Sequence, residues 1–211
     1  MKGFLLFLFG ALFLIILGTI FSLAGDKSQF LLWLTTSRYS FLDYYFYYIT
    51  LIGEPLGFII CGILVGFISW RKMLTVPILG LIIMGTSYML KSLFFHERPM
   101  TYLNRLGYQG IFSVLDYQLL LGNHSFPSGH SMAAWALFTL VAAHFNKVWV
   151  SIGCLFLAAS VSISRVYLVA HFLQDVVAGA VVGIPLGYMV YYIYFRWTTN
   201  SVVGSGVEGS K

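Results

Sequence analysis

Long uninterrupted apolar segments are the feature that most constrains how this chain can fold. Six of them follow one another, separated by short polar stretches: Gly3 to Ala24, Tyr48 to Ser69, Met73 to Leu90, His130 to His144, Val148 to Ser164 and His171 to Phe195. A helix needs about 20 apolar residues to cross the hydrocarbon core of a bilayer, and lipid-exposed backbone must satisfy its own hydrogen bonds there. We therefore predict an all-α integral membrane bundle of six transmembrane helices.

Composition supports the bilayer as the solvent of one domain. The chain is 59% hydrophobic and 9% charged, whereas soluble domains are about 45–50% apolar and about 25% charged. We predict a single six-helix domain over residues 1–197 and a disordered, Gly- and Ser-rich tail over 198–211. The net charge of +5 comes from few residues, and no basic run indicates a nucleic-acid partner. Cys61 and Cys154 fit small buried hydrophobes, and the sequence shows no metal-ligand spacing.

Two stretches between the spans are too polar to cross. Gln29 to Tyr47 mixes charged residues with many aromatic ones, which is typical of an amphipathic helix in the membrane interface. Lys91 to Gly129 is the longest polar break and predicts a loop region between spans 3 and 4, with a short helix within Tyr102 to Leu121. Long loops in compact chains are usually functional. Glu54, which precedes Pro55 near the start of the second span, is interpreted as an interfacial cap.

The positive charges predict the orientation. Six spans place both termini on one side, whose helix ends carry Lys2, Arg71, Lys72, Lys147 and Arg196. The other side carries Lys27, Arg38 and Arg105 apart from the suspected site. Since cytoplasmic loops are richer in Lys and Arg, we predict cytoplasmic termini. The rare polar residues of three distant segments then meet on the extracytoplasmic face.

The first of these segments supplies cations. Lys91 and Arg98 are seven residues apart, about two helical turns, so they can project from one face before Pro99 ends the segment. Two cations on one face suit an anion with several oxygens, and Arg adds a planar fork of donors. A positive collar at a helix end is the alternative for this pair taken alone.

The second segment is Pro127-Ser128-Gly129-His130, at the start of the fourth apolar run. A helix start with Ser and Gly leaves backbone N–H groups open and favours an anion. Ser128 can add a hydroxyl, and His130 could protonate a departing oxygen. A plain helix cap would explain the turn but not the histidine.

The third segment contains Arg165, His171 and Asp175. His171 and Asp175 are four residues apart, so on a helix they share one face. The carboxylate can then fix the tautomer of the imidazole and leave the other nitrogen free to attack. Arg165 must come from another element, most simply the end of the preceding helix. Three polar residues at a membrane surface are the alternative interpretation.

Together these motifs, K-x6-R-P, P-S-G-H and S-R-x5-H-x3-D, resemble the signature of the type 2 phosphatidic acid phosphatase family, and size and layout resemble its bacterial phosphatidylglycerophosphatase B group. The resemblance implies that His171 is a nucleophile that forms a phosphohistidine, that Asp175 orients it and that His130 is the general acid. The phosphoryl oxygens would be bound by Lys91, Arg98, Ser128, Gly129 and Arg165. The implied reaction needs no metal and no other cofactor.

The implied activity is hydrolysis of phosphatidylglycerol phosphate in the plasma membrane, with undecaprenyl diphosphate, or both lipids, as the alternative substrate. A transporter or anion-binding membrane protein, a haloperoxidase-like redox site and a phosphatase for a soluble sugar phosphate are the other hypotheses. His96 and Glu97 could shape the headgroup site, His124 is expected on the loop surface, and His144 is given no role. Oligomeric state stays open, because the small-residue stripe Gly179, Gly183 and Gly187 could pack within one chain or between two.

Overall fold

The computed structural model describes residues 2–36, 38–108, 114–115 and 117–207, with side chains described to residue 198, and within these ranges every regular element is a helix. The order is α1 (Lys2–Leu23), α2 (Gln29–Thr36), α3 (Ser40–Ile49), the 3-10 helix η1 (Thr50–Gly53), α4 (Pro55–Gly66), α5 (Trp70–Met73), α6 (Thr75–Leu93), α7 (Pro99–Arg105), α8 (Gly129–Phe145), α9 (Val148–Tyr167) and α10 (Leu173–Val207). The all-α prediction is confirmed.

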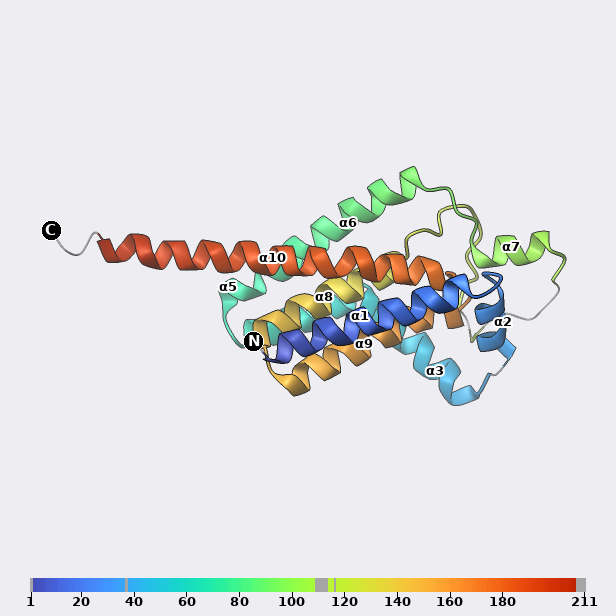
Figure 1. Ribbon diagram of the computed structural model, residues 1–211, viewed down its shortest axis with the longest axis horizontal. Coiled ribbons are helices and arrows are strands. Elements are labelled where there is room, and N and C mark those ends of the chain that lie inside the picture. Colours follow the sequence, from blue (N-terminus) through green and yellow to red (C-terminus); the bar gives the residue numbers. More distant parts are fainter. Residues whose placement is uncertain (1, 37, 109–113, 116, 208–211) are drawn as a thin grey trace.

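Helix α8 is the centre of the bundle, because every residue from Ser131 to His144 is buried. Helices α1, α9 and α10 pack around it, with α6 on another side (Figure 1). The glycine stripe of α10 faces α8: a Cβ on Gly183 would lie 2.4 Å from the Met132 carbonyl oxygen, and one on Gly187 would lie 2.2 Å from that of Ala136. The stripe therefore lets two backbones touch within one chain.

Four helical segments are long and apolar enough to cross a membrane, namely α1, α5 with α6, α9, and α10 as far as Thr198. A fifth is added if the bent pair of α3–η1 and α4 forms one span. Helix α8 has 17 residues and lies where the fourth span was predicted. The chain is thus a multi-pass membrane protein, and the count of six spans stays a prediction.

The second predicted span is broken, so the prediction of a continuous helix from Tyr48 to Ser69 was wrong. Glu54 is extended, with φ −112° and ψ −178°, because the ring of Pro55 excludes the residue before it from the α region. Pro55 then opens α4, where its missing N–H costs nothing, and the two halves meet at 66°. The predicted interfacial helix Gln29 to Tyr47 is likewise divided, into α2 and α3. Helix α3 is followed directly by η1, and the two together form the first half of the bent pair.

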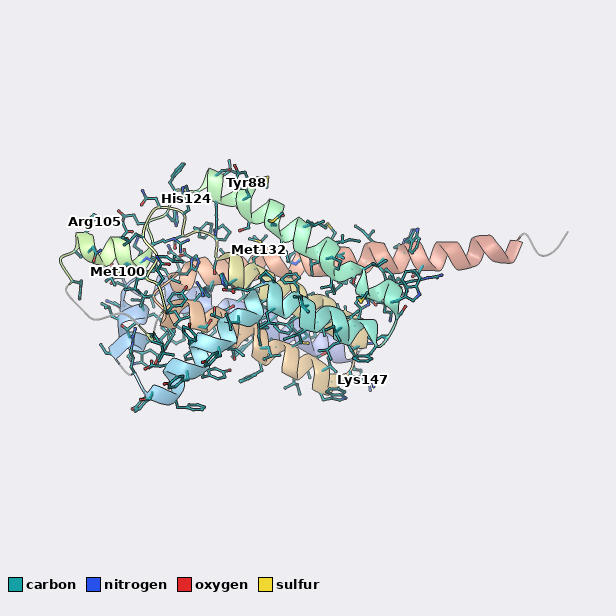
Figure 2. All side chains as sticks on the ribbon, turned by 180° about the vertical axis from the view of Figure 1, so that it is seen from behind. Tyr88, Met100, Arg105, His124, Met132 and Lys147 are labelled. Atoms are coloured by element: carbon teal, nitrogen blue, oxygen red, sulfur yellow. The ribbon has the colours of Figure 1, made fainter. Side chains whose placement is uncertain are left out.

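The two ends of the bundle differ. Helix α1 begins and α10 ends at one end, and α7 lies at the other (Figure 1). Seen from behind, Arg105 and His124 mark the α7 end and Lys147 the opposite end (Figure 2). The connections from α6 to α8 and from α9 to α10 lie at the α7 end, so the three motifs meet there (Figure 1).

The C-terminal helix is longer than the sixth predicted span, which ended at Phe195. Helix α10 continues to Val207, into the predicted tail. Residues 208–211 of that tail lie outside the described residues, and the division of the chain at residue 197 stays a prediction.

Candidate active site

His171 lies in the turn between α9 and α10, just before α10 begins. The prediction that it shares a helix with Asp175 was wrong, because the chain turns there: the His171 N–H donates to the Arg165 carbonyl at 3.1 Å, and Val169 has a φ of +57°. Asp175 is in the first turn of α10. Its Oδ2 accepts the Phe172 N–H at 3.0 Å, which is the carboxylate half of a capping box. The two side chains are nevertheless brought together.

Ser125 joins these two groups, a role that the sequence analysis missed. Its Oγ donates to Asp175 Oδ2 at 2.5 Å and lies 3.3 Å from Nδ1 of His171, which is itself 3.5 Å from the same carboxylate oxygen. All three residues are at most 3% exposed. Burial lowers the pKa of His171 to about 4, against the opposing effect of Asp175. The imidazole is therefore neutral at neutral pH, with Nδ1 held and Nε2 left as the reactive nitrogen.

Arg165 lies in the last turn of α9, as predicted, and is 1% exposed. Its Nη1 donates to Thr50 Oγ1 and its Nη2 to the Tyr117 hydroxyl, each at 2.6 Å. Its Nε has no partner, and no carboxylate pairs with it in the described part of the chain. Because both of its hydrogen-bond partners are neutral, they do not compensate the buried positive charge of the guanidinium. An incoming anion could compensate it.

Arg98 reaches the same region from the start of α7. Its Nη1 donates to the Ala170 carbonyl at 3.2 Å, next to His171 in the chain, and its backbone N–H donates to the Gly122 carbonyl at 2.8 Å. Burial lowers the pKa of Arg98, and the charge of Arg165 lowers it further. Two guanidinium groups that repel each other electrostatically are thus held within reach of one site.

The start of α8 lies close to Lys91 and to the first turn of α10. Ser128 is its N-cap: its Oγ accepts the Ser131 N–H at 3.5 Å, and its own N–H donates to the Asp175 carbonyl at 3.0 Å. Lys91 Nζ lies 3.8 Å from the point where a Cβ on Gly129 would stand. Because the first N–H groups of a helix lack intrahelical partners, this cap is suited to an anion.

His130, the first residue after Gly129, is paired with a residue that the sequence analysis interpreted otherwise. Its Nε2 lies 2.9 Å from Glu54 Oε1, and the two side chains are 28% and 42% exposed. Glu54 occupies the N-cap position of α4 but makes no capping hydrogen bond. The interpretation as a cap was therefore wrong. A carboxylate just before a proline within an apolar run could have indicated the break at Glu54, but not its partner.

The remaining candidates surround the site or lie far from it. His96 and His124 form a parallel bridge that aligns the two loop segments, and Glu97 pairs with Arg105 at 2.8 Å on the exposed side of α7. His144 is at the opposite end of α8, 3.2 Å from Thr75 Oγ1. Within the described ranges, no group of three or more His, Cys, Asp or Glu could hold a metal ion.

Comparison with curated proteins finds phosphatases. The chain is 33% identical over 88 residues to lipid A 4′-phosphatase of Bacteroides thetaiotaomicron (42% of this chain, 39% of the relative). It is 29% identical over 160 residues to mouse glucose-6-phosphatase 3 (68% and 46%). It is 38% identical over 77 residues to phosphatidylglycerophosphatase B of Bacillus subtilis (31% and 37%). The chain thus spans less than half the length of each of these relatives.

Two solved structures share the fold. LpxE of Aquifex aeolicus superimposes with a TM-score of 0.63 at 21% identity, over 77% of this chain and 92% of that one. A transmembrane PAP2-type phosphatidylglycerolphosphate phosphatase from Bacillus subtilis gives 0.56 at 24% identity, over 93% and 98%. The model of the PAP2 superfamily matches residues 70–199, more than half of the chain and all three motifs. The chain belongs to the PAP2 superfamily, that of the type 2 phosphatidic acid phosphatases.

Proposed function

We propose that this chain is a membrane lipid phosphate phosphatase that hydrolyses the phosphomonoester of phosphatidylglycerol phosphate. The observation that carries the proposal is the meeting of three distant segments at one end of the bundle. They bring together the buried guanidinium of Arg165, the half-buried one of Arg98, a helix start and a buried His–Ser–Asp arrangement. In phosphoryl transfer, positioning and charge stabilisation supply most of the catalysis, and these groups offer both.

In the first step, His171 attacks. The neutral imidazole presents Nε2 to phosphorus, while Asp175, directly and through Ser125, holds Nδ1 and stabilises the positive charge that develops on the ring. The P–N bond forms as the P–O bond to the glycerol breaks. His130, in its protonated form, gives its proton to the departing oxygen.

In the second step, water attacks the phosphohistidine. Neutral His130 now takes a proton from the water, the P–N bond breaks, and phosphate leaves with His171 restored. Throughout both steps, Lys91, Arg98 and Arg165 balance the charge of the phosphoryl oxygens, together with Ser128 and the Gly129 N–H at the start of α8. No step calls for a metal ion, so we expect activity to survive EDTA.

The location of the site supports a lipid substrate. Lys91, Arg165 and Asp175 lie at the ends of helices long and apolar enough to span a membrane, so a phosphorylated headgroup could reach them while its acyl chains stay in the bilayer. The names of the relatives include phosphatases of two lipids. The proposal includes an extracytoplasmic site in the plasma membrane and cytoplasmic termini, on the charge asymmetry of the loops.

Two other substrate classes remain candidates. Undecaprenyl diphosphate presents the same terminal phosphate on a polyprenyl tail. A soluble sugar phosphate is favoured by the similarity to glucose-6-phosphatase 3, which covers 68% of this chain. The groups described above contact the phosphate rather than the rest of the ester, so they do not separate these classes.

The test is phosphate release by the purified protein in detergent with EDTA present. Phosphatidylglycerol phosphate, undecaprenyl diphosphate, phosphatidate and glucose 6-phosphate are compared, and acid-labile, base-stable ³²P on the protein after a rapid quench reports a phosphohistidine. We expect fastest release from phosphatidylglycerol phosphate. Preference for the sugar phosphate would contradict the lipid assignment, activity only with a divalent ion would contradict the mechanism, and no release by folded protein would favour an anion-binding role.

A further inference from the structure

The bent junction between η1 and α4 lies outside the segment matched by the family model, residues 70–199, yet it contacts two of the motif residues. Thr50, in η1, accepts from Arg165 at 2.6 Å. Glu54, at the break, contacts His130 at 2.9 Å. A single short element thus holds one residue of the proposed phosphate site and the proposed general acid.

The geometry of the break aims the Glu54 carboxylate at His130. Glu54 is fixed in an extended conformation by Pro55, and its carboxylate is not used as a helix cap. Beside it, the backbone of Gly53 rests on the histidine: a Cβ there would lie 3.1 Å from both Cβ and the carbonyl oxygen of His130. The close approach of Gly53 thus sets the backbone of the break directly against the backbone of His130.

Only one nitrogen of His130 is taken up by this contact. Nε2 faces Glu54, and Nδ1 makes no hydrogen bond to any residue that the structure describes. In the protonated ring, Nε2–H would be held by the carboxylate while Nδ1–H points to the substrate. An acid that holds one ring nitrogen and leaves the other free is also found in catalytic triads, although there the held nitrogen is Nδ1 and here it is Nε2.

We propose that Glu54 is the positioning residue of the general acid, holding Nε2 of His130 so that Nδ1 delivers the proton to the leaving oxygen. This inference rests on the proposed phosphatase function. When the P–O bond breaks, the Nδ1–H proton moves to the alkoxide, and the neutral ring keeps its Nε2–H on Glu54. Water returns a proton to Nδ1 when it attacks the phosphohistidine, which restores the starting state.

The charges around His130 make this support necessary. Burial disfavours the protonated ring most, and the charges of Arg165 on α9 and Lys91 on α6 disfavour it further, whereas Glu54 favours it. Without the carboxylate, His130 would therefore lose its proton at a lower pH. The pH range in which His130 is protonated would then end at a lower pH, and the alkaline limb of the pH–rate profile would move down with it.

Substrates with different leaving groups separate this role from a structural one. The leaving group of an alkyl phosphate such as phosphatidate is a strongly basic alkoxide, which needs a proton. The leaving group of nitrophenyl phosphate is a stable phenolate, which does not. We expect Glu54→Gln to lower kcat/KM about 10- to 100-fold for the alkyl ester and less than about threefold for the aryl ester. The alkaline limb for the alkyl ester should move down by roughly one pH unit.

Asp26→Asn is the control for loss of a negative charge, because the hydrogen-bond partners of that carboxylate are Ser28 and Tyr102, neither of which belongs to the proposed site. We expect this control to keep both rates and the position of the alkaline limb. Glu54→Asp, which keeps the charge on a shorter side chain, should recover part of the loss. If Glu54→Gln does not yield a monodisperse protein, Glu54→Asp serves as the test. Its loss of kcat/KM should then be larger for the alkyl ester than for the aryl ester.

Equal losses on the alkyl and aryl esters, or an unmoved alkaline limb, would overturn the role of Glu54 while the phosphatase function stands. A wild-type protein inactive on every ester would instead contradict the proposed function itself. The two failures are therefore distinguishable.

Discussion

The two catalytic histidines proposed here stand in opposite surroundings. His171 is 3% exposed and held by Ser125 and Asp175, which are fully buried. His130 has a side chain that is 28% exposed, and its partner Glu54 is 42% exposed. One imidazole is thus fixed inside the protein, and the other is partly exposed.

The difference fits what each ring has to do. A nucleophile must be neutral and must return to one position in each cycle, and burial among fixed hydrogen bonds provides both. A proton donor must be charged when substrate arrives and must exchange protons with water, which favours partial exposure and a carboxylate partner. What differs most between the two rings is the partner: a buried serine and aspartate for His171, and a partly exposed glutamate for His130.

The largest expected effect separates the two rings directly. His171→Ala should lower kcat at least about 10⁴-fold, because no other group can form the covalent intermediate. His130→Ala should cost about 10²- to 10³-fold on a lipid ester. Phosphate release from identical amounts of monodisperse protein measures both, with His144→Ala, at the far end of α8, as the control. Equal effects at the two sites would break the comparison.

Substitution of the acidic partner of each ring should follow the same order, with the larger loss of activity at the partner of His171. Asp175→Asn keeps the shape and an acceptor for the Phe172 N–H but removes the charge that stabilises the ring during attack. We expect a loss of roughly 10³-fold in kcat, by analogy with the carboxylate of other catalytic triads, and a larger one than for Glu54→Gln. A phosphoenzyme that still forms at the wild-type rate in a rapid-quench experiment would show that Asp175 is dispensable.

A smaller effect is expected from the contact that joins the two halves of the site. A Cβ on Gly179 would lie 2.7 Å from the carbonyl oxygen of Ser128, so Gly179→Ala should push the start of α10 away from that of α8. We expect about a tenfold loss of activity and a lower thermal midpoint in detergent. Gly85→Ala is the control, since a Cβ there meets nothing within 4 Å, and a loss of equal size in it would point to general destabilisation.

The smallest expected change is in a titration. Because burial lowers the pKa of His171 to about 4, its folded ring stays neutral on acidification from pH 8 to pH 5, whereas an unfolded histidine with a pKa of about 6.5 becomes protonated over that range. NMR of ¹³C-labelled histidine, assigned by the His171→Ala variant, should show a chemical shift for His171 that stays constant above pH 5. A midpoint near 6.5 would mean that the ring is not shielded from water.

The sequence predicted the elements that depend on local pattern. Lys91, Arg98, Ser128, Gly129, Arg165 and the pair of His171 and Asp175 lie at one end of the bundle, as the order of apolar runs indicated. The glycine stripe also packs as its spacing predicted. These predictions succeed because periodicity and motif spacing carry them. The roles given to these residues stay predictions.

The errors concern contacts made across long separations and one irregular turn. Glu54 and His130 are 76 positions apart, and no pattern within either segment indicates the other. The position of Ser125 between His171 and Asp175 depends on how the loop before α8 folds back. The turn at Val169 has a positive φ without a glycine to announce it. Only the break at Glu54 could have been inferred, from Pro55.

The buried guanidinium of Arg165 has a consequence for the whole cycle. Its two partners, Thr50 and Tyr117, carry no charge, so an arriving anion neutralises it and a departing anion exposes it again. We therefore expect the site to bind inorganic phosphate for the same reason that it would bind substrate. We expect turnover to be limited by product release, with phosphate a strong inhibitor and the resting enzyme in a cell largely occupied by it.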